Sequence, residues 1–171
     1  GFRSSAVKIM ATTNLSHIEW SQMPEVGHLS FGIVVSEWNH EITGNLLKGA
    51  LTVLKKAGVK KKNIRVEYVP GSFELAHGAQ LMIESANPDA VICLGSIIKG
   101  ETPHFDFVSQ ATAQGIMQVG LQYGLPVIFG VLTDDNVQQS KDRSGGKLGN
   151  KGSEAAATAI KMADLRQRML L

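Results

Sequence analysis

The chain has little of what marks a secreted, membrane-spanning or nucleic-acid-binding protein. Its 171 residues include one cysteine, which excludes an internal disulfide and fits a reducing compartment. No apolar run approaches the roughly 20 residues that cross a bilayer, and the first thirty residues contain no compact apolar segment of a signal peptide. The 17 basic and 15 acidic residues leave a net charge of +2, too small to indicate nucleic acid. We therefore expect a cytoplasmic protein with no membrane or nucleic-acid partner.

Apolar side chains are plentiful enough for one globular domain. They make up 43% of the chain, which is typical of a protein that buries a core. We place the domain at residues 29–171 and expect residues 1–28 to be a loosely held N-terminal arm. A cloning remnant is one interpretation of residues 1–9, because the sequence from Met10 would make an ordinary start. Cys93 stands in an apolar run and is interpreted as core packing rather than as a nucleophile.

Strand and helix patterns alternate four times after the arm. Short apolar runs predict strands, and amphipathic spacing predicts helices between and after them. Repeated strand–helix units without hairpin signals predict a three-layer α/β/α sandwich around a four-stranded parallel sheet, of the flavodoxin-like kind. The expected strands are 29–36, 64–69, 90–98 and 126–132, and the expected helices are about 41–57, a helix ending at 86, about 103–123, a short helix to 143, and about 153–168.

The unusual residues follow the carboxyl ends of the predicted strands. These ends are where open α/β sheets bind ligands, so we expect the four segments to share one crevice. They are SEWN at 36–39, VPGSFE at 69–74, GSIIKGETPH at 95–104 and FGVLTDDN at 129–136.

The third of these segments combines a predicted helix start with a histidine. We expect Thr102 to be the N-cap and Pro103 the first helical residue, so that amides around Glu101 and Thr102 could bind a phosphate. His104 is either a capping or packing residue or a group that acts on a ligand. Its charge at pH 7 stays open, because the helix dipole disfavours imidazolium and a bound phosphate favours it.

Two further side chains have a structural and a functional interpretation. Trp38 either packs at a strand end or stacks on a flat ligand. Arg143 is either a solvated residue at a helix end or a bidentate ligand for phosphate.

Several common motifs of catalytic and binding sites are not found in the sequence. The segment SGGKLGNKGS lacks the spacing of a phosphate loop, the histidines have no metal-ligand spacing, and Ser72 lacks the Gly-x-Ser-x-Gly elbow of serine hydrolases.

Five segments in order resemble the lumazine synthase family, which catalyses the penultimate step of riboflavin biosynthesis. The resemblance covers roughly residues 29–165 and rests on GIVVSEWN, VPGSFEL, LGSIIKGETPHFDFV, GLPVIFGVLT and DRSGGKLGNKG. It implies that 5-amino-6-(D-ribitylamino)uracil condenses with 3,4-dihydroxy-2-butanone 4-phosphate. The products are 6,7-dimethyl-8-ribityllumazine, phosphate and water, and no metal or organic cofactor is implied.

The resemblance also implies the site residues. His104 would transfer protons, and Trp38 would stack on the pyrimidine where the family more often has phenylalanine, so that riboflavin could also bind. The residues implied for the pyrimidine and ribityl chain are Trp38, Asn39, Ser72, Phe73, Glu74, Ser96, Ile97 and Ile98. Those implied for the butanone phosphate are Glu101, Thr102, Phe129 and Arg143.

The family assembles from many copies. Members form rings of five, the N-terminal arm adds to a neighbour's sheet, and each active site lies between two subunits. The short glycine turn at residues 145–149 indicates an icosahedral shell of sixty subunits, with a free pentamer or decamer as the alternative. Riboflavin synthase is a further partner to consider. A flavin-binding or storage module, or a shell-forming structural protein, remains an alternative that would not need His104 and Arg143 together.

Overall fold

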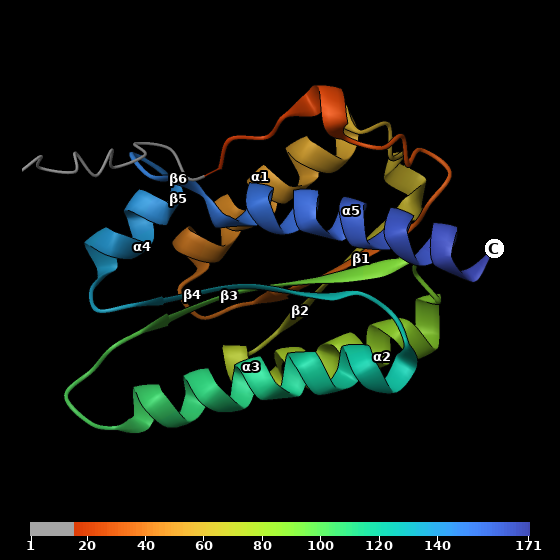
Figure 1. The fold of residues 1–171 in the computed structure, drawn as a ribbon. Helices are drawn as coiled ribbons and strands as arrows, with labels where there is room; N and C mark the ends of the chain where they lie inside the picture. The colour runs from red at the N-terminus through yellow and green to blue at the C-terminus, as the bar shows by residue number, and fades with distance from the viewer. Residues whose placement is uncertain (1–15) are drawn as a thin grey trace, which may run out of the picture.

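The computed structural model describes residues 16–171, which form three layers. The middle layer is a four-stranded parallel sheet in the order β2-β1-β3-β4. In Figure 1, α2 and α3 lie on one face of this sheet, and α1 and α5 lie on the other. The predicted α/β/α sandwich is therefore confirmed. The strands are β1 (Phe31–Ser36), β2 (Ile64–Val69), β3 (Ala90–Ile98) and β4 (Val127–Asp134).

The order of the strands explains their composition. β1 and β3 are central and buried on both faces, so they are continuous apolar runs without polar alternation. β2 lies at one edge, and each of its side chains is partly buried or exposed. Phe31 of β1 pairs with Ile64 of β2 on one side and with Ala90 of β3 on the other. This register brings the carboxyl ends of the three parallel strands to the same edge of the sheet.

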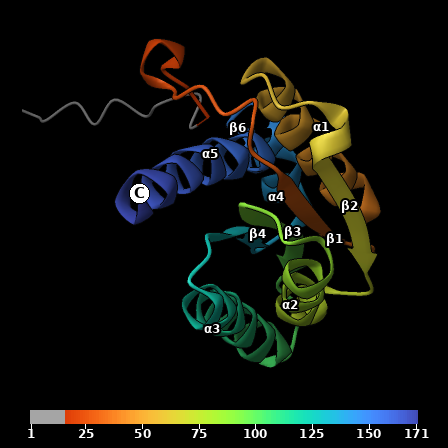
Figure 2. The same ribbon diagram turned by 90° about the vertical axis from the view of Figure 1, so that its right-hand side faces the viewer.

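Helices cover both faces of the sheet, as the view in Figure 2 shows. α1 packs with α5 over a core cluster that includes Leu46 and Ile160, and α2 packs with α3 over a cluster that includes Leu75 and Ile116. Gly124 ends α3 in the left-handed conformation (φ 57°), as the sequence predicted. The helices are α1 (His40–Lys56), α2 (Leu75–Ala86), α3 (His104–Tyr123), α4 (Val137–Arg143) and α5 (Lys151–Leu170).

Two helix starts differ from the prediction. Pro103, not Thr102, is the N-cap of α3, and His104 is its first helical residue, because Pro103 supplies the carbonyl that accepts from Asp106. α5 begins two residues before the expected Ser153, because the side-chain oxygen of Asn150 caps the amides of Gly152 and Ser153. Asn150, a residue type that commonly caps helices, was thus the sequence signal for the start of α5 that the prediction missed.

A small hairpin stands where a plain glycine turn was expected. Strands β5 (Ser144–Gly146) and β6 (Gly149–Asn150) pair antiparallel between α4 and α5. Gly145 and Gly149 have φ of 103° and 98°, a region that non-glycine residues rarely adopt. Both glycines are therefore needed for the connection between the last two helices.

Residues 16–28 pack against helices of the same chain. Val26 is buried, and Trp20 packs on the α1–α5 cluster with the Lys56 ammonium 4.4 Å from its ring centroid. His28 hydrogen-bonds Gln167 near the end of α5. Residues 16–28 are thus held more firmly than the loosely held arm that we expected, because apolar side chains such as Ile18 and Met23 pack against the α1–α5 cluster. Residues 1–15 lie outside the described residues.

Candidate functional site

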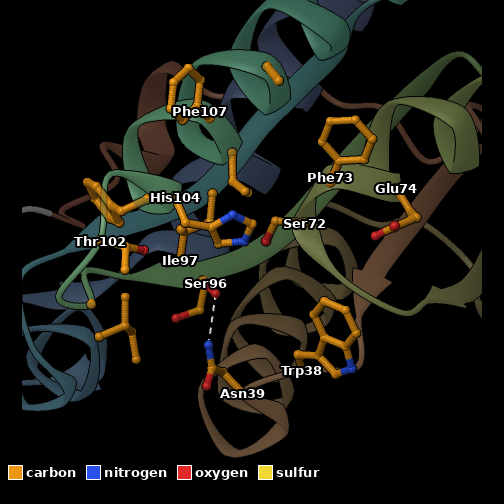
Figure 3. Close-up of a pocket in the computed structure, with 15 residues that line it drawn as sticks. Trp38, Asn39, Ser72, Phe73, Glu74, Ser96, Ile97, Thr102, His104 and Phe107 are labelled. Carbon is orange, nitrogen blue, oxygen red and sulfur yellow. Dashed lines mark hydrogen bonds between the residues drawn. The ribbon is translucent and has the colours of Figure 1, made fainter.

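A cleft of about 780 Å³ opens at the carboxyl ends of the strands. Figure 3 shows the side chains that surround it. Ten of the thirteen residues proposed from the sequence line this cleft, so segments far apart in the chain meet there as predicted. These ten are Trp38, Asn39, Ser72, Phe73, Glu74, Ser96, Ile97, Ile98, Thr102 and His104.

The turn after β1 is bonded to both neighbouring strand ends. The amide of Trp38 donates to the carbonyl of Pro70, beyond β2, and the Asn39 side chain donates to the carbonyl of Ser96 at 2.9 Å. Asn39 precedes α1 with φ 60°, and its side chain makes no cap hydrogen bond to that helix. The amide group that sequence analysis assigned to a ligand therefore also fixes the geometry of the cleft.

The Trp38 indole lies over Gly71 and is 67% exposed. A Cβ added at Gly71 would lie 2.5 Å from Trp38 Cε3, so the ring can occupy this place only above a glycine. The Glu74 carboxylate accepts from the Gly71 amide at 3.1 Å and fixes the same turn. An exposed aromatic ring held in one place is suited to stacking on a flat ligand.

The floor of the cleft contains buried hydroxyl groups. Ser72 and Ser96 are almost fully buried, and the Ser72 hydroxyl oxygen would lie 2.6 Å from a Cβ at Gly95. The Ser96 hydroxyl is buried and has no hydrogen-bond partner within residues 16–171. Buried hydroxyls are normally paired, so this group is available to a ligand or to water.

The first turns of α3 form the remaining wall. His104 is exposed and its ring points into the cleft in Figure 3, while Phe107 stands at the rim and is 71% exposed. The other lining residues were not predicted, although Phe107, Val108 and Ala111 follow His104 on one face of the helix. The additional lining residues are Gly100, Phe105, Phe107, Val108 and Ala111.

Three proposed residues and the fourth strand end are not part of the cleft wall. Phe129 lies on β4, in a second groove of about 530 Å³ between the ends of α3 and α5. Arg143 ends α4, where its Nη2 lies 3.5 Å from Glu154 Oε2. Glu101 is exposed beside the cleft but does not line it. The expectation that all four strand ends share one crevice is therefore wrong for the end of β4.

The groups in the cleft can bind and transfer protons. Histidine is suited to proton transfer near neutrality, and the cleft offers hydroxyls, carbonyls and aromatic faces for orientation. Within residues 16–171 there is no group of three side chains that could hold a metal ion, and no helix is long and apolar enough to span a membrane. Complete burial raises the pKa of the Cys93 thiol to about 12, so this thiol is unsuited to nucleophilic catalysis.

Fold and cleft together define an open, parallel α/β protein with a cleft at the carboxyl ends of its strands, the place where such sheets commonly bind small ligands. A sequence profile described as 6,7-dimethyl-8-ribityllumazine synthase matches residues 28–167. The chain belongs to this family.

Curated relatives carry the same name. The chain is 52% identical over 162 residues to 6,7-dimethyl-8-ribityllumazine synthase of Phocaeicola vulgatus, covering 94% of this chain and 96% of that protein. It is 55% identical over 136 residues to the Bacteroides fragilis enzyme, covering 80% and 95%, and 48% identical over 160 residues to that of Porphyromonas gingivalis, covering 92% and 99%. Among solved structures, a GDP-L-fucose synthetase from Naegleria fowleri aligns at 15% identity with a TM-score of 0.40, covering 86% of this chain and 46% of that one, too low a similarity to bear on function.

Proposed function

We propose that the protein condenses 5-amino-6-(D-ribitylamino)uracil with 3,4-dihydroxy-2-butanone 4-phosphate to give 6,7-dimethyl-8-ribityllumazine, phosphate and water. The observation that carries this proposal is the meeting of an exposed indole, buried serines and a histidine in one cleft. The family assignment supports the same reaction. The fold alone would support many activities, so the site residues decide.

The pyrimidine substrate is proposed to lie along the strand ends. Its flat ring would stack on Trp38, and its polar edge and ribityl hydroxyls would meet the turn at residues 72–74 and the end of β3 at residues 96–98. The buried Ser96 hydroxyl, which has no partner within the described part of the chain, supports a polar contact there. Asn39 would contribute its side-chain oxygen, since its nitrogen is bonded to Ser96.

His104 is the proposed proton-transfer group. The amine must add to a ketone, the carbinolamine must lose water, phosphate must leave and the ring must close, and each step moves a proton. The imidazole extends from the first residue of α3 into the cleft where both substrates would meet. Much of the remaining acceleration would come from holding the two substrates in one orientation.

Phosphate is proposed to lie beside the turn at Glu101 and Thr102. Backbone amides would hold it, since a carboxylate facing phosphate would repel it. Phe129 would pack against the same substrate, and Arg143 would bind the phosphate through a bidentate guanidinium. Neither side chain lines the cleft of its own chain.

We propose that a second copy supplies Phe129 and Arg143 and so completes each cleft. The groove that contains Phe129 is apolar, and its rim exposes large side chains at Met117, Leu121 and Met169. Clustered exposed apolar groups of this kind mark an interaction surface. A ring of five subunits has closed symmetry, so every such surface in the ring is covered.

We further propose that twelve such rings form a sixty-subunit shell. The short glycine hairpin between α4 and α5 is the connection that the family resemblance associates with shells. The addition of the N-terminal arm, residues 1–28, to a neighbour's sheet stays part of the proposal, and the first fifteen of these residues lie outside the described residues. A cytoplasmic location stays part of the proposal, since one cysteine suits a reducing compartment.

Mixing the purified protein with both substrates tests the activity. Lumazine fluorescence and phosphate release should rise together in a one-to-one ratio, and neither should rise when one substrate is omitted. A flavin-binding module would bind riboflavin and release no phosphate, and a shell protein would do neither. Failure to release phosphate would overturn the proposed activity.

Analytical ultracentrifugation tests the assembly. Sixty copies of the 18.4 kDa chain have a mass of about 1.1 MDa, and five copies about 92 kDa. We expect the larger species. A species of about 92 kDa would reject the shell and keep the shared cleft, whereas an active species near the mass of one chain would reject both.

A further inference from the structure

We propose that Glu154 and Ser16 are positioning residues that hold the Arg143 guanidinium in the orientation that binds phosphate. The inference rests on the proposed role of Arg143. It is drawn from one group of contacts at the start of α5, outside the cleft that binds the pyrimidine.

The ion pair between Arg143 and Glu154 is partly shielded from water. Nη2 and Oε2 are 3.5 Å apart, and the two side chains are 25% and 24% exposed. Arg143 Nε is buried and has no hydrogen-bond partner within residues 16–171. Glu154 is therefore the partner that the structure gives this guanidinium, and one pair leaves its remaining N–H groups for a ligand.

Glu154 is itself fixed by the segment before β1. The Ser16 hydroxyl lies 3.0 Å from Glu154 Oε2 and 3.0 Å from the Asn150 carbonyl, and it accepts from the Asn150 amide at 2.7 Å. Because a hydroxyl has one hydrogen, Ser16 donates to one of its two acceptors at a time. Ser16 thus joins the carboxylate to the residue that caps α5.

The start of α5 is a rigid base for this carboxylate. Gly152 packs so closely on α1 that an added Cβ would lie 1.9 Å from the Leu46 carbonyl oxygen. The Asn150 side chain caps α5 and also donates to the carbonyl of Asn45 in α1 at 2.9 Å. Glu154 lies in the first helical turn, where the positive end of the dipole stabilises a negative charge.

This arrangement has a consequence for ligand binding. A free arginine side chain has many rotamers, and ordering it opposes binding. Holding the guanidinium before the ligand arrives reduces that cost. Glu154 would also neutralise Arg143 while no phosphate is bound, so part of its effect is to orient and part is to balance charge.

A double-mutant cycle tests the inference on the full-length protein. Glu154→Ala should raise the KM of the butanone phosphate about threefold to tenfold and leave that of the pyrimidine unchanged. Glu154→Gln keeps an oxygen that can accept from Arg143 and Ser16, so it should stay within about twofold of wild type. Ser16→Ala should shift the same KM about twofold. In an Arg143→Ala background, Glu154→Ala should have no further effect.

Matched controls separate positioning from a general effect on the fold. Asp164→Ala removes another ion pair of α5, with Arg168 at 2.8 Å, and Ser21→Ala removes another hydroxyl of the N-terminal segment. Neither should change either KM. Thermal unfolding of every variant identifies a loss of fold.

Binding of inorganic phosphate, followed by calorimetric titration, keeps the test independent of turnover. If the wild type makes lumazine but the effects of Glu154→Ala and Arg143→Ala simply add, the inference is wrong and the proposed function stands. If the wild type makes no lumazine, coupling of the two substitutions in phosphate Kd still supports the inference. Phosphate binding that is insensitive to Arg143 and Glu154 would overturn it.

Discussion

The Asn39 side chain donates a 2.9 Å hydrogen bond to the Ser96 carbonyl and so joins the end of β1 to the end of β3. Asn39 adopts φ 60°, in the left-handed region that asparagine tolerates better than most residues. The backbone conformation and the side-chain amide of Asn39 therefore determine how the turn that contains Trp38 lies beside the floor of the cleft.

Substitution of Asn39 separates these two features. Asn39→Gly keeps the left-handed backbone accessible and loses the hydrogen bond, and should destabilise the fold by about 1 kcal/mol. Asn39→Ala loses both and should cost about 2 kcal/mol. Urea unfolding measures both values, and the KM of the pyrimidine should rise in each variant. If both variants unfold like wild type, the hydrogen bond does not stabilise the cleft.

His104→Ala should fold normally and lower kcat by roughly 10²-fold, because a proton-transfer group is lost while substrate orientation is kept. His104 is exposed, so little core packing is removed. His77→Ala, an exposed histidine of α2 outside the cleft, is the matched control and should leave kcat unchanged. An unchanged kcat in His104→Ala would remove this residue from the mechanism.

Arg143→Ala should weaken binding of the phosphate substrate by about 1.5–3 kcal/mol, or roughly 10- to 150-fold in KM. The affinity for the pyrimidine alone should change little, because the proposed contact of Arg143 is with the phosphate and not with the pyrimidine. Arg168→Ala removes an exposed arginine of α5 and serves as the control. Equal weakening of both substrates would show that Arg143 acts through the fold.

The sheet could be predicted from the sequence because its central strands are buried on both faces. The unbroken run at residues 90–98 can be only a core element, and its length favours a strand over a helix. Short-range features were less predictable. From the sequence, α5 could begin directly after an Asn150 cap or at Ser153. Only the packing of Gly152 on α1 decides between these two starts.

The cleft was predictable where the polar residues follow a strand. Trp38, Ser72 and Ser96 were found from this rule and from the family resemblance, whereas Phe107 was not, because an aromatic residue in a helix usually packs in a core. Phe129 is separated from the cleft because it is the third residue of β4 and pairs with Cys93, whereas the cleft-lining residues of β3 pair with the carboxyl end of β4.

Mixing two impaired variants tests the central claim that each cleft is completed by a second copy. His104→Ala and Arg143→Ala should each be impaired alone. If His104 and Arg143 of one site come from different subunits, random co-assembly of equal amounts makes about a quarter of the sites intact, with activity restored to that level. If both come from the same chain, no site is intact, and the mixture will show only the mean activity of the two variants. Activity at that mean in assemblies verified to contain both variants would contradict the shared site.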